Sequence, residues 1–401
     1  MPNSFQVLIV GGGAAGISVA ASLKHRDSSL RIAIVEPTET HVYQPGQTLV
    51  GRGVMSLQQL KRPVKGLIPA GVEWIKASVT GFSPDTNEVT LDNNDTLGYE
   101  QLVVCLGLKL DLEGIEGLTE TLGKNGVTSN YITDLSTYTW DQVQKLTSGR
   151  ALFTQPPMPI KCAGAPQKAM YLSCDFWKKE SRLSGMEVEF HNAGAVMFGV
   201  AEFVPVLESY VKDYGIKPRF GSTLVKVDGP AKKAWFKQSD GNIEETTFDL
   251  LHVTPPQCAP DVVAQSALAN EAGWVEVDQT TLQHSHFKNI FSLGDVCSAP
   301  NAKTAAAVRK QVPIVADNLI AARKNQPMTG IYDGYGACPL TVEVGKVVLA
   351  EFGYGGSLKP SFPLDAKVPS RFYWWMKTTG FPWVYWHLMM RGREWLVKTK
   401  P

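Results

Sequence analysis

A glycine-rich turn between two apolar strands constrains the fold of this chain more than any other feature. Residues 5–10 (FQVLIV) are apolar and branched, which is typical of a buried parallel strand, and residues 11–16 (GGGAAG) follow before the helical residues 17–26. A second strand, residues 31–36, ends at Glu36, whose carboxylate can accept hydrogen bonds from a ribose. This order predicts a βαβ unit that binds the ADP part of a dinucleotide, rather than a glycine turn without a ligand.

The residues of this turn have distinct expected roles. Gly11 permits the tight turn, Gly13 lets the backbone approach a pyrophosphate, and Gly16 allows the helix to pack closely on the strand. Ala14 and Ala15 begin the helix, where free N–H groups and the helix dipole favour phosphate.

Two later segments favour FAD over NAD as the nucleotide of this first domain. Residues 99–111 and 286–300 each lead from an apolar strand into a glycine turn, and an alanine-rich helix, 301–323, directs its N-terminus toward a flavin. From about residue 5 to 325 the chain resembles the FAD domain of glutathione-reductase-like flavoproteins. The contacts predicted from these segments are Gly107, Gly294, Asp295, Lys303 and Thr304.

A Pro-Gly turn follows the second strand, in residues 41–51 (HVYQPGQTLVG). We expect this turn to lie over the flavin, where Tyr43, Gln44, Pro45 and Gly46 are candidate cofactor contacts. The alternative is a crossover loop without a role in binding.

The middle of the chain lacks a second glycine-rich phosphate loop. Residues 150–158 predict the first strand of a second doubly wound domain, but the turn after it reads QPPMPIKCAGAPQK and contains no G-x-G. Gly194 and Gly199, after a later strand, have the wrong spacing. We therefore expect the second domain to keep its fold without binding NAD(P)H.

A cysteine stands where that phosphate loop is missing. Cys162 lies just before a predicted helix that begins at Pro166, and the helix dipole together with Lys168 would favour a thiolate. The alternatives are a buried structural cysteine and a solvated lysine. A second cysteine, Cys338, lies in a Gly/Tyr turn before Pro339. No CxxC pair or Cys/His cluster has metal-ligand spacing, so no metal is expected.

Several segments together closely resemble sulfide:quinone oxidoreductases, in the branch that includes the mitochondrial enzyme. They are HVYQPGQTLVG, PIKCAGAPQKAMYLS, LLHVTPPQ, SLGD, KTAAAV and YDGYGACPL, and the resemblance extends over essentially the whole chain. It implies FAD, a redox-active Cys162–Cys338 pair, and a membrane quinone such as ubiquinone. Lys168 is then a candidate for stabilising the thiolate or guiding an anionic acceptor.

The same resemblance implies a reaction. Hydrosulfide, from hydrogen sulfide, attacks a disulfide between Cys162 and Cys338, and the released Cys162 thiolate reduces FAD. The sulfane sulfur, here placed on Cys338, passes to sulfite, glutathione, cyanide or another sulfide, and the flavin reduces the quinone. The sequence leaves open whether Cys162 or Cys338 carries this sulfur. The spacing of 176 positions does not show that the two sulfurs meet.

The last 33 residues, 369–401, are rich in aromatic and basic side chains, and five of the ten tryptophans lie there. Ser370 predicts a helix cap, and Gly380 with Pro382 predicts a break between two short helices. Such a segment suits the surface of a membrane without spanning it, although a core lid or dimer interface is the alternative. Candidate quinone contacts are Phe352, Lys377, Phe381 and Trp383, and further basic residues are Arg391, Arg393, Lys398 and Lys400.

The chain is predicted to have an α/β fold with two doubly wound Rossmann-like domains of the FAD-dependent disulfide-reductase type and a C-terminal aromatic membrane-interface segment. Residues 1–114 and 285–330 form the FAD-binding domain, 115–284 the second Rossmann-like domain, and 331–401 the quinone and membrane region. No apolar run reaches 18 residues and no signal peptide is seen, which favours a peripheral protein of a bacterial or mitochondrial inner membrane.

The net charge of +1 gives no electrostatic reason for binding nucleic acid. A homo-oligomer is left open. Three other functions remain in competition: a type II NADH:quinone dehydrogenase, a sulfide dehydrogenase subunit with a cytochrome partner, and a flavin-binding interaction protein without turnover.

Overall fold

A mainly parallel sheet forms around the N-terminal strand in the computed structural model, which describes residues 4–300 and 302–397. The predicted strand is β1, and its apolar residues from Val7 to Val10 are all buried because both faces of a parallel sheet are covered. The strand order is β5 (Val72–Ile75), β2 (Ile32–Val35), β1 (Ser4–Val10), β8 (Thr96–Val104), β7 (Glu88–Leu91) and β6 (Val79–Ser83), with β19 (Ile290–Ser292) beside β8.

Two long helices pack against each other on this sheet. Helix α1 (Ala14–Arg26) starts at the glycine turn, and α9 (Ala305–Arg323) is the predicted alanine-rich helix. Thr304 caps α9 by accepting a hydrogen bond from the Ala307 N–H at 3.2 Å. Both helix N-termini therefore lie at the end of the sheet where the parallel strands have their carboxyl ends, the usual ligand-binding edge of such a sheet.

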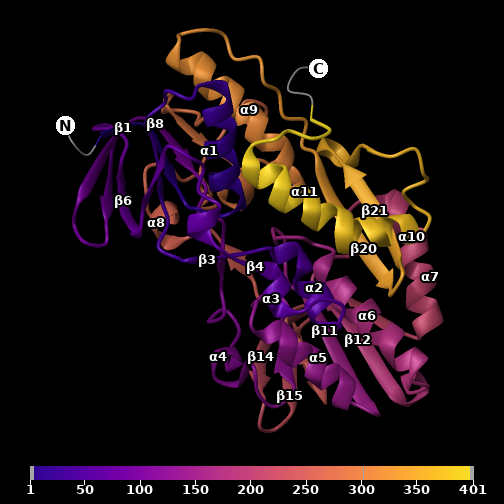
Figure 1. The fold of residues 1–401 in the computed structure, drawn as a ribbon. Coiled ribbons are helices and arrows are strands. Elements are labelled where there is room, and N and C mark those ends of the chain that lie inside the picture. The colour runs from indigo at the N-terminus through magenta and orange to yellow at the C-terminus, as the bar shows by residue number, and fades with distance from the viewer. Residues whose placement is uncertain (1–3, 301, 398–401) are drawn as a thin grey trace.

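A second parallel sheet carries the middle of the chain, and Figure 1 shows it below the first. Its order is β10 (Val127–Thr128), β17 (Leu250–His252), β11 (Gly149–Gln155), β12 (Met186–Asn192) and β13 (Lys217–Phe220). The accompanying helices are α5 (Leu135–Lys145), α6 (Ala165–Lys179) and α7 (Val204–Tyr214), and an antiparallel meander comprises β14 (Thr223–Asp228), β15 (Lys233–Lys237) and β16 (Ile243–Thr247). The predicted α/β class is confirmed, whereas the domain boundaries stay predictions.

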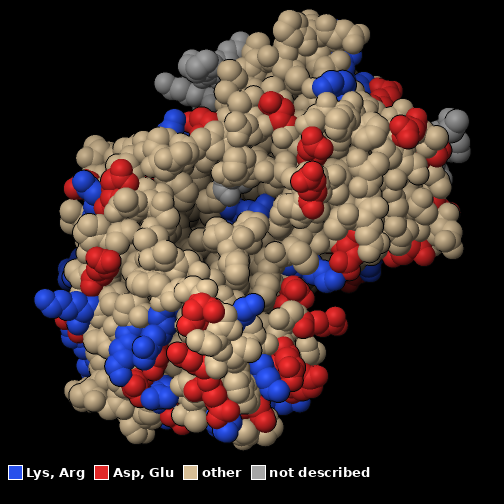
Figure 2. Space-filling view, turned by 180° about the vertical axis from the view of Figure 1, so that it is seen from behind, with Lys and Arg blue, Asp and Glu red and all other residues tan. Residues whose placement is uncertain are grey.

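Shorter elements lie in the segments between these strands and helices. They are β3 (Thr40–Val42), α2 (Gln47–Val50), α3 (Leu57–Leu60), β4 (Lys61–Pro63), β9 (Lys109–Leu110), α4 (Leu118–Thr121), β18 (Gln257–Cys258) and α8 (Asp261–Ala264). Viewed from behind, charged side chains crowd the lower part of the molecule, and the surface is hollowed near its centre (Figure 2).

The C-terminal region begins with an antiparallel hairpin, β20 (Gly336–Glu343) and β21 (Lys346–Phe352). Helix α10 (Arg371–Trp375), capped by the Ser370 side chain as predicted, then continues through a π turn, Met376–Gly380, into α11 (Phe381–His387). The predicted break at Gly380 and Pro382 is therefore wrong. Proline has no backbone N–H, but Pro382 lies in the first turn of α11, where that donor is not needed.

Polar contacts, one of them buried, fix this C-terminal region to the first sheet and its helices. The Arg26 guanidinium of α1 contacts Asp317 of α9 at 2.7 Å and Glu394 of the tail at 2.6 Å. His41 Nε2 and the Tyr385 hydroxyl are 2.6 Å apart. Lys398 and Lys400 lie outside the described residues, within which no helix is long and apolar enough to cross a bilayer.

The glycine turn yields a matched pair of substitutions. In Gly16→Ala the new Cβ would overlap the Gly11 carbonyl oxygen and approach Ile9 Cγ2 to 3.2 Å, so we expect a loss of about 1–3 kcal/mol in the free energy of unfolding. At Gly13 no heavy atom lies within 4 Å of an added Cβ, so Gly13→Ala should change stability by less than about 0.5 kcal/mol. Urea unfolding of both variants checks this, and equal losses would contradict the packing role of Gly16.

Candidate functional site

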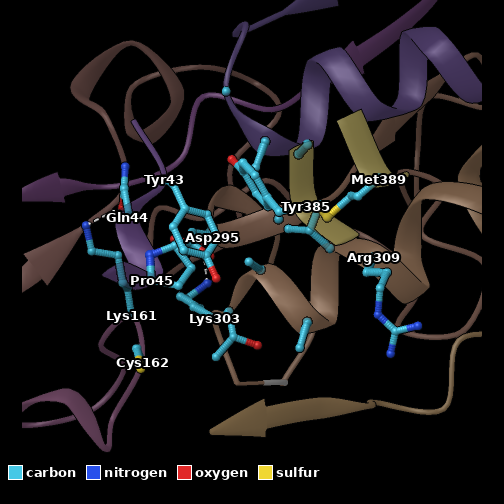
Figure 3. Close-up of a pocket in the computed structure, with 18 of the residues that line it drawn as sticks. Tyr43, Gln44, Pro45, Lys161, Cys162, Asp295, Lys303, Arg309, Tyr385 and Met389 are labelled. Carbon is cyan, nitrogen blue, oxygen red and sulfur yellow. Dashed lines mark hydrogen bonds between the residues drawn. The ribbon is translucent and has the colours of Figure 1, made fainter. Parts of the chain in front are cut away.

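One elongated cavity of about 580 Å³ runs from the glycine turn and the cysteine loop to the C-terminal region. Figure 3 shows Lys161 and Cys162 at one end and Arg309 with Met389 at the other. The predicted residues that line it are Gly11, Gly13, Ala14, Ala15, Glu36, Tyr43, Gln44, Pro45, Gly107, Cys162, Lys168, Gly294, Asp295, Lys303, Thr304, Lys377 and Phe381. Residues distant in sequence are thus gathered around a single hollow.

The glycine turn forms the floor of one end of the cavity. Gly11 has a φ of +102°, and a Cβ there would lie 2.6 Å from the Cys105 carbonyl oxygen, so only glycine fits. Gly13 faces open space, whereas Gly16 lies behind the turn against Gly11 and does not line the cavity. The Glu36 carboxylate accepts hydrogen bonds from the Gly12 N–H at 2.7 Å and the Thr38 hydroxyl at 2.6 Å, which hold it at the cavity wall.

The start of α9 forms the adjoining part of the cavity wall, beside α1, and connects it to the cysteine loop. The Lys303 ammonium donates to the carbonyls of Asp295 (2.5 Å) and Cys297 (3.1 Å) and lies 4.0 Å from the Trp274 ring centre. The Lys303 carbonyl in turn accepts a hydrogen bond from the Cys162 N–H at 2.9 Å. Burial raises the pKa of Asp295, although Lys303 and Lys161 act in the opposite direction.

The lining of the cavity fits a bound cofactor with polar atoms of its own. Thr48 and Asn130 are buried and line the cavity, yet the Thr48 hydroxyl and both amide atoms of Asn130 have no hydrogen-bond partner among the described residues. A buried polar group without a partner costs roughly 1–3 kcal/mol. A ligand with complementary donors and acceptors would remove that cost, so these residues and the glycine turn fit a flavin nucleotide.

The two candidate cysteines are adjacent in space. Their sulfur atoms lie 3.8 Å apart, and because a disulfide bond is about 2.05 Å long, the two cysteines are not bonded to each other in this structure. Cys162 lines the cavity with a φ of +51°, the left-handed region that few side chains adopt, whereas Cys338 on β20 is buried behind it. A Cβ at Gly164 would overlap the Cys338 sulfur, so glycine at this position lets the cysteine loop lie close to Cys338 on β20.

A buried lysine polarises this pair. Lys168 is only 2% exposed, and its ammonium lies 3.1 Å from the Cys162 sulfur, which excludes a solvated helix lysine. A hydrogen bond from Cys338, together with the Lys168 charge, holds the pKa of Cys162 well below its usual range despite burial. The hydrogen bond to Cys162 and burial raise the pKa of Cys338. Burial lowers the pKa of Lys168, but the negative sulfur atoms outweigh it and raise that pKa.

A second buried lysine lies at the same cavity. Lys377, in the π turn, is 3% exposed and donates a hydrogen bond to the Pro45 carbonyl at 2.7 Å. Burial, with repulsion from Lys168, lowers the pKa of Lys377 to about 7. Its side chain can therefore lose a proton as an ammonium, or gain one as a neutral amine, near neutral pH.

Two predicted quinone contacts lie elsewhere. Phe352 packs against Phe198, with ring centres 6.0 Å apart, and Trp383 is exposed on the outer surface beside His387. Neither lines the cavity. The strand alternation of β21 and the turn of α11 direct both side chains away from it, a consequence of register that the aromatic composition did not reveal.

Sequence reasoning missed other residues of the cavity. The Tyr131 hydroxyl donates to the carbonyls of Lys161 (3.0 Å) and Cys162 (3.2 Å), and the Lys161 ammonium contacts Gln44 Oε1 at 2.7 Å. Lys161 could have been found because it directly precedes Cys162. Tyr131 and Asn130 carry no signal, since SNYITD (residues 129–134) is an ordinary polar loop before a helix.

Comparison with known proteins gives a consistent result. Residues 5–311 match the family model described as pyridine nucleotide-disulphide oxidoreductase. The chain is 41% identical to the mitochondrial sulfide:quinone oxidoreductase of Dictyostelium discoideum, covering 98% of this chain and 87% of that protein, and 38% identical to that of Mus musculus, covering 97% and 87%. It also resembles the fold of the Aquifex aeolicus sulfide:quinone oxidoreductase, with a TM-score of 0.82, 19% identity, and 97% and 92% of the chains covered.

The contact between Lys168 and Cys162 is tested by Lys168→Met. Removing the cation should raise the pKa of Cys162, so the pH midpoint of its alkylation by iodoacetamide in the reduced protein should rise by about 1 unit or more. Peptide mass spectrometry identifies the peptide that carries alkylated Cys162 and measures the rate of its alkylation at each pH. Lys178→Met is the control, because Lys178 is on the same helix but exposed and paired with Asp213; equal midpoints in the two variants would contradict the assignment.

The lowered pKa of Lys377 predicts a pH-dependent stability difference. Between pH 7 and about 10.4, Lys377 is protonated in the unfolded chain but not in the folded one. The free energy of unfolding of the native chain should therefore rise with pH across this window. The stability of Lys377→Met relative to the native chain should therefore fall by up to about 3 kcal/mol between pH 7 and 9.5. Urea unfolding at both pH values measures it, with exposed Lys367→Met as the control. A constant difference would show that Lys377 stays protonated.

Proposed function

The chain belongs to the sulfide:quinone oxidoreductases of the pyridine nucleotide-disulphide oxidoreductase family, and we propose that it oxidises hydrosulfide at Cys162 and Cys338 and delivers two electrons through FAD to a membrane quinone. The observation that carries this proposal is the pair of sulfurs 3.8 Å apart, with Lys168 against one of them at the wall of the cavity.

The cofactor of this family is a flavin, and the residues of the cavity support FAD. The glycine turn and the start of α1 would hold the pyrophosphate of FAD, and Glu36 would hold its ribose. Asp295 and the start of α9 would contact the remaining parts of the cofactor. When bound, FAD accepts an electron pair from a thiol donor and passes it to a quinone. Cys162, rather than Cys338, lines the cavity, so Cys162 is the sulfur that we place next to the flavin.

The two thiols would be oxidised to a disulfide in the resting enzyme. Hydrosulfide attacks the Cys338 sulfur, the bond between the two cysteines breaks, and Cys162 leaves as a thiolate while Cys338 keeps the incoming sulfur as a persulfide. The lower pKa of Cys162 makes it the better leaving group, and the Lys168 ammonium stabilises the charge that it acquires. The direction of attack thus follows from the position of one lysine.

The persulfide would then transfer its outer sulfur to a small nucleophile. Sulfite, glutathione, cyanide or a second hydrosulfide forms a bond to that sulfur, and Cys338 is released as a thiolate or, after protonation, as a thiol. The two cysteines together then hold the electron pair taken from sulfide, and their oxidation restores the disulfide. The raised pKa of Cys338 favours its protonation after this step.

Lys377 is suited to handling protons at the same cavity. Reduction of a quinone to a quinol consumes two protons, and a lysine with a pKa of about 7 can supply one and be protonated again at neutral pH. The Pro45 carbonyl fixes its Nζ at 2.7 Å. We assign Lys377 the role of holding a proton at Nζ near the quinone.

The part of the cavity wall that the tail contributes supports a lipid-soluble substrate. The lining residues of this part are mainly apolar and include Phe362, Phe381, Val384, Met389 and Trp395. The adjoining tail exposes Phe372, Trp375 and Trp383, side chains that favour the headgroup level of a bilayer. We propose a peripheral attachment to a mitochondrial or bacterial inner membrane, from which ubiquinone or a related quinone enters.

The thiol relay is tested by Cys162→Ser and Cys338→Ser in the flavin-loaded enzyme. Sulfide added without oxygen should reduce the flavin of the native enzyme, and each substitution should slow this at least about 100-fold, because neither leaves a disulfide to attack. Flavin absorbance gives the rate, and a short-chain quinone should reoxidise the flavin.

Cys258→Ser is the matched control, because Cys258 is a free cysteine outside the cavity lining. Flavin reduction by sulfide that survives both site substitutions would refute the relay. Reduction by NADH instead of sulfide would favour the NADH dehydrogenase of the same architecture.

A further inference from the structure

A second, shallower cavity of about 610 Å³ lies on the surface where the tail meets α1. Its polar lining is basic and contains no Asp or Glu among the described residues. We call it the basic pocket, and its ring-bearing or basic residues are Lys24, His25, Trp383, His387, Arg391 and Arg393. None of them belongs to the cavity of the thiol pair.

The positive charge of the basic pocket is not neutralised by carboxylates. Lys24 donates to the carbonyls of Ser28 (2.5 Å) and Leu30 (3.1 Å), and Arg391 donates to the Gly66 carbonyl at 3.1 Å. Within residues 4–300 and 302–397, none of the pocket's basic side chains forms an ion pair. Glu394, adjacent to Arg393 in sequence, is held by Arg26 at 2.6 Å instead. The pocket therefore attracts an anion.

An exposed tryptophan at the rim connects the basic pocket to the apolar surface of the tail. Trp383 is 55% exposed, and its ring centre lies 5.5 Å from that of His387. Trp375, eight residues earlier and 53% exposed, presents a second large apolar side chain. Indole rings favour the boundary between headgroups and acyl chains, so the pocket opens at the depth where lipid phosphates lie.

We propose that the basic pocket binds the phosphate of an anionic lipid headgroup. Arg391 and Arg393 supply planar donors suited to phosphate oxygens, and Lys24 adds a point charge. Trp383 contacts the boundary to the acyl chains. A free phosphate would use the same donors but would leave the exposed indole without a role, so the lipid is the occupant. This inference rests on the proposed attachment of the tail to a membrane.

The position of the pocket connects lipid binding to the quinone cavity. Helix α11 contributes Trp383 and His387 to the basic pocket, whereas its Phe381, Val384 and Tyr385 line the cavity of the thiol pair. The spacing places these two sets on opposite faces of one helix. A headgroup seated in the pocket would thus hold the helix that borders the quinone entrance at the bilayer surface.

The test compares two double variants of the flavin-loaded enzyme that each lose two charges from the tail region. Arg391→Gln/Arg393→Gln removes the arginines of the basic pocket, and Lys367→Gln/Arg371→Gln removes exposed charges outside it. Cosedimentation measures binding to phosphatidylcholine vesicles with and without 20% phosphatidylglycerol at constant ionic strength. We expect the native enzyme to prefer the anionic vesicles, and the pocket variant to lose about 30-fold in partitioning onto them, corresponding to about 1 kcal/mol per charge.

The control variant should lose clearly less than the pocket variant, and 10 mM inorganic phosphate should not displace the native enzyme. Equal losses of vesicle binding in both variants would mean that anionic vesicles attract the positive charges of the tail without a specific site. That result would overturn the proposed binding of lipid phosphate in the basic pocket. Displacement by phosphate would make it a site for free phosphate, and absence of any preference for anionic vesicles would also overturn the inference. Sulfide-dependent reduction of a soluble short-chain quinone should be equal in all three proteins, so a failure of the pocket is distinguishable from a failure of the proposed function.

Discussion

The contact between the Lys168 ammonium and the Cys162 sulfur, 3.1 Å long, is the interaction on which the rest of the site depends. An ammonium at 2% exposure is tolerable only with a partner of opposite charge, because transferring an unpaired ion out of water costs several kcal/mol. The thiolate is that partner, and each group therefore maintains the ionised form of the other. The same contact distinguishes the two cysteines chemically, although Cys338 belongs to the same buried cluster of side chains against which Cys162 packs.

Local pattern was enough to predict the parts of the site that lie within one βαβ unit. The order of strand, glycine turn, helix and Glu36 determines where those residues lie, because each short segment has one favoured backbone geometry. The pairing of Cys162 with Cys338 came from family resemblance instead. Residues 176 positions apart are brought together only by the packing of β20 against α6, and no rule of periodicity contains that information.

The orientation of single side chains was the least predictable part. Phe352 and Trp383 were chosen for their aromatic character, but the register of β21 and the rotation of α11 direct them elsewhere. The orphan groups of Thr48 and Asn130 likewise depend on how α2 meets the loop before α5, which no motif indicates. Composition indicated the region of the proposed quinone site, and only the backbone geometry assigned the inner and outer faces of that region.

The π turn in the tail has a consequence for how this segment tolerates length changes. An α-helix advances by about 100° per residue, so an unbroken one would separate Trp375 and Trp383 by roughly 80° around its axis. The wider turn at Met376–Gly380 reduces that rotation, and both indoles are exposed while Lys377 is buried. Deleting one residue here would therefore rotate α11 about its axis, and different side chains of α11 would face the cavity and the surface. Natural insertions and deletions should accumulate in exposed surface loops such as residues 240–242 rather than in this stretch.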